Sequence, residues 1–100
     1  MTTDLAFRMT VQELFSIKGR GTVVTGQIES GTLAVGDEIR INGRSSSRKT
    51  VVAGVEVARK VVPRARAGDH VGVLLKDISE QDVQQGDVLT GSESIFTWEA

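Results

Sequence analysis

The sequence predicts an all-β fold, an antiparallel barrel or sandwich, from the spacing of its apolar residues and its turn residues. Apolar and polar residues alternate with period two, as at Phe7, Met9 and Val11, and this alternation is typical of half-buried strands. Three Gly-Asp pairs each stand directly before an apolar run and predict turns that lead into strands. No window shows a long apolar stripe of helical period, so many short strands joined by short turns are expected.

The first half of the chain predicts three strands. Phe7, Met9 and Val11 mark the first. The second, Thr22 to Ile28, is entered through a Gly19-Arg20-Gly21 turn, with Gly26 marking a bulge or a close backbone approach. Gly36-Asp37 leads into the third, around Ile39 and Ile41. The Asn42-Gly43 turn and a polar loop over 44–48 follow it.

The second half begins with the longest alternating run, in which Val51, Ala53, Val55 and Val57 share one face of a strand. Pro63 lies just past this run, where it can end a strand. The two later Gly-Asp pairs lead into further strands, at Val71 to Val73 and after Asp87. Residues 79–85, SEQDVQQ, predict one helical turn capped by Ser79.

Composition excludes several classes of protein. The 100 residues predict one domain, with its core over 5–90 and a tail or edge strand over 91–100. The chain has no cysteine and one histidine, so neither a disulfide framework nor a Cys- or His-rich metal site is expected. No signal peptide and no apolar run of membrane-spanning length is present, which favours a cytoplasmic protein that does not enter a membrane.

Charge is unevenly distributed along the chain. Residues 40–66 hold eight basic residues against one acid, whereas the residues from Asp77 onward hold six acids and no base. Such a distribution can produce a two-faced surface that attracts a polyanion to one side. Hydrated loops and strand faces explain it equally well.

The stretch GRGTVVTG over residues 19–26 raises the question of a phosphate-binding loop. A Walker loop needs a lysine and a hydroxyl residue after its last glycine, but Gln27 and Ile28 follow Gly26. A dinucleotide fingerprint needs a third glycine opening a helix, but Gly21 is followed by Thr22-Val23-Val24, which favour a strand. The stretch therefore predicts a turn and a strand, and no GTP-binding loop or other cofactor site is expected.

Three segments resemble the second domain of elongation factor Tu. They are FRMTVQELFSIKGRGTVVTGQIESGTLAVGDEI over 7–39, KTVVAGVEVARK over 49–60 and RAGDHVGVLLKDISEQDVQQGDVL over 66–89. The resemblance implies a closed six-stranded antiparallel β-barrel of the kind that translational GTPases share. The GTPase domain of that family has no counterpart here, so the resemblance implies no GTP hydrolysis and no catalytic residue.

The resemblance also implies an RNA-binding site, because this barrel holds the 3′-terminal adenosine and the aminoacyl group of charged tRNA. Ile17, Gly19, Val23 and Leu74 match the surround of the adenine, and Glu56 matches the acid against the base. Without the resemblance, Ile17, Val23 and Leu74 would be assigned to the barrel core, and Glu56 to an exposed strand.

Phe15 and Thr25 match positions near the amino-acid end of the site. His70 stands where the family usually has asparagine, and its bulk and charge would disfavour an α-ammonium group. Arg20, Arg59 and Lys60 are candidates for phosphate contacts, which position a nucleic acid without specifying its sequence.

The function expected from this resemblance is weak, non-catalytic binding of RNA, either the tRNA acceptor end or ribosomal RNA. One alternative is a protein-interaction barrel, since Ile95-Phe96-Thr97-Trp98 could offer an anchor to a partner or close the barrel as an edge strand. Another is a fragment of a longer elongation GTPase, although the initial Met1 favours a complete small protein. An enzyme is not expected, because no nucleophile–base pair or metal set is recognisable.

Overall fold

The computed structural model of the chain describes residues 6–44 and 46–91. The segment Ile95–Trp98, and with it the choice between an edge strand and an anchor, lies outside these residues. Ten strands and one 3₁₀ turn are formed: β1 Arg8–Thr10, β2 Glu13–Ile17, β3 Gly21–Ser30, β4 Thr32–Ala34, β5 Glu38–Asn42, β6 Ser47–Val57, β7 Lys60–Val62, β8 Arg64–Arg66, β9 His70–Leu75, η1 Glu80–Asp82 and β10 Val88–Gly91.

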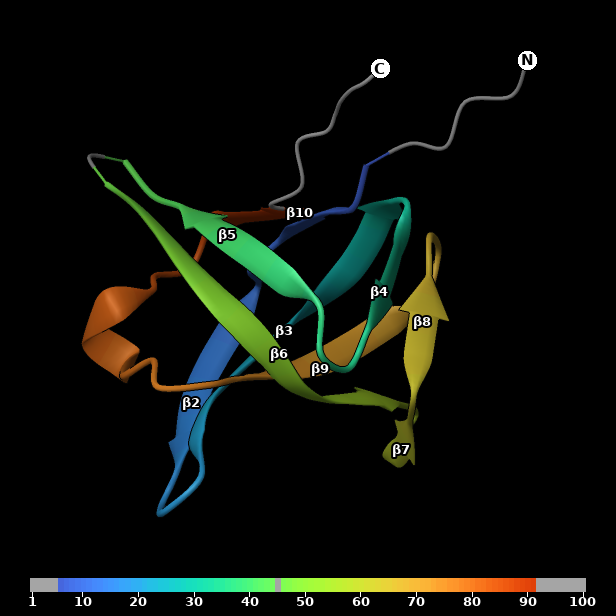
Figure 1. The fold of residues 1–100 in the computed structure, drawn as a ribbon, viewed down its shortest axis with the longest axis horizontal. Coiled ribbons are helices and arrows are strands. Elements are labelled where there is room, and N and C mark those ends of the chain that lie inside the picture. The colour runs from blue at the N-terminus through green and yellow to red at the C-terminus, as the bar shows by residue number, and fades with distance from the viewer. Residues whose placement is uncertain (1–5, 45, 92–100) are drawn as a thin grey trace.

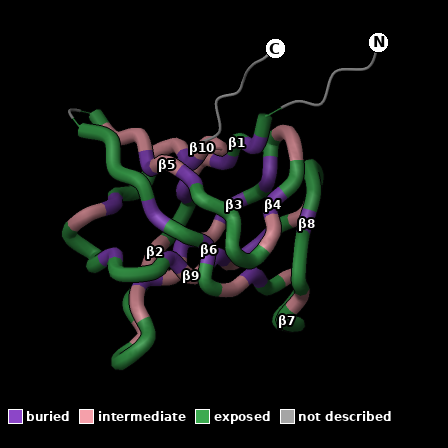
Figure 2. Tube along the Cα trace, in the orientation of Figure 1, coloured by how far each residue is buried: buried purple, intermediate pink, exposed green. Residues whose placement is uncertain are grey.

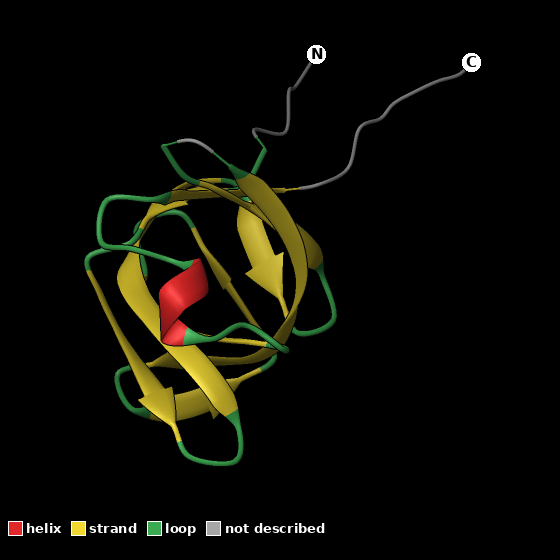
Figure 3. Cartoon of the chain, turned by 90° about the vertical axis from the view of Figure 1, so that its left-hand side faces the viewer, coloured by secondary structure: helices red, strands yellow, loops and turns green. Residues whose placement is uncertain are grey.

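Six of the strands close into a ring, and all their pairings are antiparallel. The order is β1-β10-β5-β6-β9-β3, and β1 pairs with β3 to complete it. Figure 3 shows the strands curving around a common centre, with the η1 turn lying across the ring in that view. The expected all-β fold and the closed six-stranded barrel are therefore confirmed.

The remaining strands extend this barrel. β2 pairs with the first half of β3, whereas β1 pairs with its second half. β7 pairs with the end of β6, and β4 forms a separate two-stranded sheet with β8. The β2–β3 hairpin and the β6–β7 hairpin both reach the lower side of the molecule in Figure 1, with β9 between them.

The interior is filled by one side-chain face of each barrel strand. Met9, Val24, Val73, Leu75 and Leu89 are fully buried, and exposed or half-buried residues alternate with them along the tube in Figure 2. The prediction that alternate residues face the core is confirmed at the first strand, where Phe7, Met9 and Val11 are all buried. Alternation therefore decides which face of the barrel each side chain joins.

The prediction that Val51 and Ala53 share one face of β6 with Val55 was wrong. Val52 and Val55 are buried, whereas Val51 and Ala53 are exposed. The register against β9 shifts between Val52 and Gly54, so an extra residue is inserted there and reverses the alternation. The expected polar loop over 44–48 is also shorter than predicted, because Ser47 and Arg48 already belong to β6.

The predicted helical turn at 79–85 is present but short. Only Glu80–Asp82 are helical, in a 3₁₀ turn that follows Ser79. The Asp82 carboxylate accepts hydrogen bonds from the Ser79 backbone nitrogen at 3.0 Å and from its hydroxyl at 3.1 Å. These bonds, together with the nearby Arg48, lower the pKa of Asp82.

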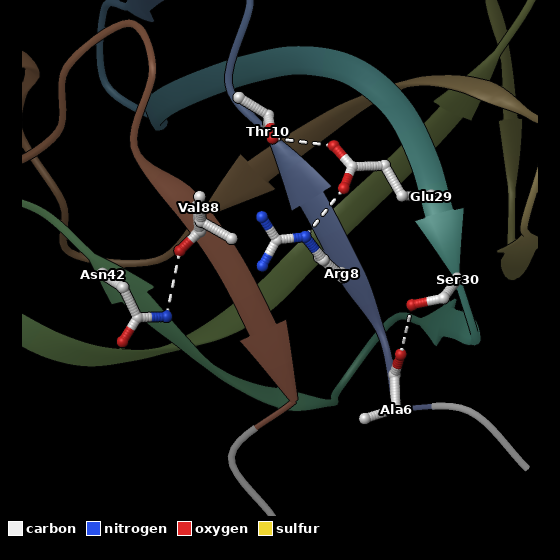
Figure 4. Close-up of polar contacts among 7 residues, drawn as sticks. All are labelled: Ala6, Arg8, Thr10, Glu29, Ser30, Asn42 and Val88. Carbon is white, nitrogen blue, oxygen red and sulfur yellow. Dashed lines mark hydrogen bonds and ion pairs between the residues drawn. The ribbon is translucent and has the colours of Figure 1, made fainter.

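The seam where β1 closes the barrel is reinforced by polar side chains (Figure 4). The Glu29 carboxylate of β3 accepts from Arg8 Nε at 2.8 Å and from Thr10 Oγ1 at 2.7 Å, and both donors belong to β1. These hydrogen bonds, first from Thr10 and then from Arg8, lower the pKa of Glu29. The three side chains are exposed or half-buried, so their interactions add little stability. Their main effect is to fix the register of β1 against β3.

The three Gly-Asp turns predicted from the sequence share one geometry. Gly36, Gly68 and Gly86 have φ of 96°, 96° and 94°, which only glycine adopts readily. In each turn the following aspartate accepts a hydrogen bond from the backbone nitrogen three residues before it, at 2.9, 3.0 and 2.9 Å. The turns deliver the chain into β5, β9 and β10 as expected.

Replacing Asp37, Asp69 or Asp87 by alanine is expected to lower the free energy of unfolding by about 1 kcal/mol each, because a backbone donor loses its partner. Urea denaturation of the three variants measures this. The asparagine variants keep a side-chain oxygen and should recover most of the loss. An effect equal in the asparagine and alanine variants would contradict a role for the hydrogen bond.

Candidate nucleic-acid interface

A hollow of about 180 Å³ opens on the outer surface of the barrel between the β2–β3 hairpin and the β6–β7 hairpin. We call it the base hollow, and its lining residues are Phe15, Ile17, Arg20, Val23, Ala53, Gly54, Glu56, Val61, Gly72 and Leu74. It is smaller than the roughly 300–1,000 Å³ of pockets that enclose whole small-molecule ligands. The space suits a single ring system.

The sheet register places these residues in two neighbouring rows. Phe15, Val23, Leu74 and Gly54 stand opposite one another across β2, β3, β9 and β6. The next row runs from Gly72 to Glu56 and on to Val61. Because Gly54 and Gly72 carry no side chain, the surface is low where they lie and is bounded by the apolar side chains around them.

The backbone does not require glycine at either position, because a side chain would have room there. A Cβ built on Gly72 would lie 3.6 Å from Val23 Cγ1, and one built on Gly54 would lie 3.6 Å from Leu74 Cβ. These are ordinary contact distances, and neither glycine has a positive φ. Side chains at these positions would therefore fit the barrel and fill the base hollow.

The alternative assignment of Ile17, Val23 and Leu74 to the barrel core is wrong. All three are only half-buried and line the base hollow. Val23 and Leu74 are each preceded or followed by a core valine, Val24 or Val73, that is completely buried. Since neighbouring strand residues point to opposite faces, Val23 and Leu74 face outward.

Two exposed apolar side chains flank the mouth of the base hollow. Val61 of β7 is 78% exposed and Phe15 of β2 is 46% exposed, although each belongs to a formed strand. A single exposed apolar residue needs no explanation, but two that face a common hollow can cover a planar apolar ligand.

The charged side chains that line the base hollow are Arg20 and Glu56. Both are exposed, and among residues 6–44 and 46–91 neither takes part in an ion pair or a side-chain hydrogen bond. A carboxylate accepts hydrogen bonds from amino groups, and a guanidinium donates to phosphate or carbonyl oxygens. The hollow thus combines apolar walls with one free acceptor and one free donor.

The β6–β7 hairpin that carries Glu56 and Val61 turns through Ala58 and Arg59. Both have positive φ, 53° and 68°, and Val57 pairs with Lys60 on either side of them. Such two-residue turns normally use asparagine and glycine, so the local conformation costs about 1 kcal/mol or more. The turn places Arg59 and Lys60 at the exposed end of the hairpin.

Six of the eleven residues expected at the RNA site line the base hollow: Phe15, Ile17, Arg20, Val23, Glu56 and Leu74. Thr25 and His70 lie on the same outward face of the sheet but outside the hollow, and Arg59 and Lys60 lie at the hairpin end. Gly19 lies in the β2–β3 turn and lines a different hollow.

Sequence reasoning missed Ala53, Gly54, Val61 and Gly72. The two glycines carried a usable signal, because an isolated glycine inside an alternating strand often marks a close approach by a ligand or another backbone. Ala53 was assigned to the wrong face because the bulge was not foreseen. Nothing in the local pattern around Val61 distinguishes it from an ordinary strand residue.

Neither a metal-ligand cluster nor a membrane-spanning helix is found among the described residues. No group of three or more His, Cys, Asp or Glu side chains within them could hold a metal ion. Nor does that part of the chain contain a helix long and apolar enough to cross a membrane.

A comparison against protein families agrees with the barrel fold. The family model for elongation factor Tu domain 2 matches residues 21–90, which contain strands β3 to β9 and all of β10 except its last residue. The match extends over β6, β7 and β9, which supply six of the ten residues that line the base hollow. The chain therefore belongs to the elongation factor Tu domain 2 family.

Proposed function

We propose that this protein is a non-catalytic translation-factor module that binds the terminal nucleoside of an RNA in the base hollow. The observation that carries the proposal is a hollow of about 180 Å³ with apolar walls and a free carboxylate, Glu56, in its lining. Unstacked RNA bases bind in such places, stacked on apolar or aromatic side chains and hydrogen-bonded at their edges. A tRNA acceptor end or an exposed nucleotide of ribosomal RNA would supply the ligand.

The roles of the lining residues follow from their chemistry. Phe15 and Val61 would cover the two sides of the base, while Val23 and Leu74 form the apolar floor beneath it. Glu56 would accept a hydrogen bond from an exocyclic amino group of the base. Arg20 would meet the phosphate that follows, with Arg59 and Lys60 adding positive charge at the hairpin end.

The affinity of this site is expected to be low. One stacked base contributes about 1–3 kcal/mol, and association costs an estimated 4–15 kcal/mol. Binding in the micromolar to millimolar range is therefore the expected result for a short RNA. The position of Thr25 and His70 outside the hollow supports nucleoside binding more than recognition of an attached amino acid.

The test is an NMR titration of the protein with adenosine and with a CCA trinucleotide. Amide resonances of Val23, Glu56 and Leu74 should shift on addition of either ligand, in fast exchange. Glu56→Ala should weaken adenosine binding about fivefold, because one charge-assisted hydrogen bond is lost.

Glu13→Ala is the matched control. Glu13 is an exposed carboxylate in the same outward row of the sheet, opposite Thr25, but it does not line the base hollow. Its loss should leave adenosine binding unchanged. Absence of any shift around the base hollow at millimolar adenosine and trinucleotide would overturn the proposed function.

A further inference from the structure

A second hollow, of about 490 Å³, lies between the β2–β3 hairpin and the η1 turn. We call it the hairpin–η1 hollow. Ile17 lines both this hollow and the base hollow, whereas Lys18 and Gly19 line only the former and Arg20 only the latter. The tip of the β2–β3 hairpin therefore separates two adjoining hollows.

The chemistry of the hairpin–η1 hollow differs from that of the base hollow. Its polar lining comes from Ser16, Lys18 and Thr22 of the hairpin and from Ser79, Glu80 and Gln81 around the η1 turn. Hydroxyl, carboxylate and amide groups bind sugar hydroxyls and the edges of bases. The carboxylate of Glu80 disfavours a phosphate on the η1 side of this hollow, whereas Lys18 favours one on the hairpin side.

Positive charge is concentrated on the tip between the two hollows. Lys18 and Arg20 are both exposed there, on either side of Gly19. Gly19 has a φ of 79°, and a Cβ built on it would meet no atom within 4 Å. The backbone of the tip is thus open to close approach by a ligand group, and phosphate is the group that the two cations would attract.

The two walls of the hairpin–η1 hollow are tied to each other. The Thr22 hydroxyl, which is completely buried, donates to the Ile78 carbonyl oxygen at 2.6 Å. The Ser16 backbone nitrogen donates to Glu80 Oε2 at 2.9 Å, across 64 residues of sequence. Because these bonds link the hairpin to the segment that carries η1, the hollow is formed without a ligand.

We propose that the hairpin tip stands between two successive nucleotides of one RNA strand. The terminal nucleoside occupies the base hollow, the nucleotide before it occupies the hairpin–η1 hollow, and the phosphate that joins them lies against Lys18 and Arg20. This inference rests on the proposed function and adds a second nucleotide subsite to it. Ile17, which lines both hollows, is the apolar side chain between the two bases.

The experiment compares adenosine with the dinucleoside monophosphate CpA by NMR titration at low salt. CpA should bind about tenfold more tightly, equivalent to about 1.4 kcal/mol. Amides of Ser79 and Gln81 should shift with CpA and not with adenosine. Added salt should weaken CpA binding and leave adenosine binding unchanged, because only CpA carries a phosphate.

Two lysine variants locate the phosphate. Lys18→Ala should weaken CpA binding about fivefold and leave adenosine binding unchanged. Lys49→Ala, which removes an exposed cation from β6 away from both hollows, should change neither. Both substitutions are at exposed positions, and unchanged chemical shifts in the core confirm that each variant is folded.

The outcomes separate the two proposals. If adenosine binds but CpA binds no more tightly and leaves Ser79 and Gln81 unshifted, the second subsite is overturned and the proposed function stands. If Lys49→Ala weakens CpA binding as much as Lys18→Ala does, the phosphate is not held by the hairpin tip. If neither ligand binds, both proposals are overturned.

Discussion

Gly26→Ala should lower the free energy of unfolding by about 3 kcal/mol, because the added methyl group would meet the backbone of a neighbouring strand. A Cβ built on Gly26 would overlap the carbonyl oxygen of Thr10 and lie within 3.3 Å of two atoms of the Met9 side chain. The methionine can move, but the carbonyl belongs to the backbone of β1. The strands must therefore separate to admit the methyl group.

The position of Gly26 in the sheet explains why the backbone comes so close. Along β3, Ile28 and Ser30 pair with β1, whereas residues 21–25 pair with β2. Gly26 lies where the partner changes, and the chain between β1 and β2 crosses over it. The hydrogen bonds from Gln12 to the Thr25 carbonyl and from Val11 to the Asp87 carbonyl, both 2.8 Å, hold that crossing in place.

Gly72→Ala is the matched control for this prediction. Gly72 is also a strand glycine with ordinary φ, but its Cβ would meet only Val23, at 3.6 Å. Alanine there should raise stability slightly, by roughly 0.5 kcal/mol, because glycine is costly within a strand. Urea denaturation measures both, and Gly26→Ala should also lower the melting temperature by roughly 10–20 °C. A loss below about 1 kcal/mol for Gly26→Ala would show that the crossing adjusts at little cost.

Gly26 also illustrates how much of the fold the sequence could predict. A glycine within the β-branched run Thr22 to Ile28 indicated a bulge or a close backbone approach, and the structure shows the close approach. The Gly-Asp turns were equally predictable, because the positive φ and the aspartate hydrogen bond depend on neighbouring residues alone. Features of this kind are encoded locally.

The bulge in β6 was not predictable in the same way. Val51, Val52 and Ala53 are all compatible with either face of a sheet, so the alternation permits two readings around them. The shift is imposed by β9, which places Leu75 opposite Val52 and Leu74 opposite Gly54. The partner strand lies about twenty residues further along the chain, and no local pattern contains it.

The candidate site likewise has one part that the sequence could predict and one part that depends on contacts between distant segments. Resemblance to the elongation factor Tu barrel indicated four apolar residues and the carboxylate of the base hollow, and the structure brings these five together: Phe15, Ile17, Val23, Leu74 and Glu56. It did not indicate that Gly19 lies beside the η1 turn, because Ile78 and Thr22 meet through a buried hydrogen bond between distant segments. The base hollow follows from residue types on strands, whereas the hairpin–η1 hollow depends on tertiary contacts.

Gly72→Val should abolish adenosine binding while leaving the barrel at least as stable as it was. The β-branched side chain suits a strand, and its Cβ would make an ordinary contact with Val23. Its methyl groups would then project from the floor into the base hollow, between Leu74 and Glu56. We expect the dissociation constant for adenosine to rise more than tenfold, measured by NMR titration or calorimetry, with an unchanged or higher urea midpoint.

His70→Val separates this effect from a general change in the surface of β9. His70 points outward two residues before Gly72 on the same strand, is exposed, and does not line the base hollow. Valine there should leave adenosine binding within twofold of the original. Loss of stability cannot account for lost binding if Gly72→Val unfolds at the same or higher urea concentration. If adenosine still binds to Gly72→Val, the ligand must bind elsewhere on the barrel. The reason is that the base hollow cannot hold both the valine side chain and the base of adenosine.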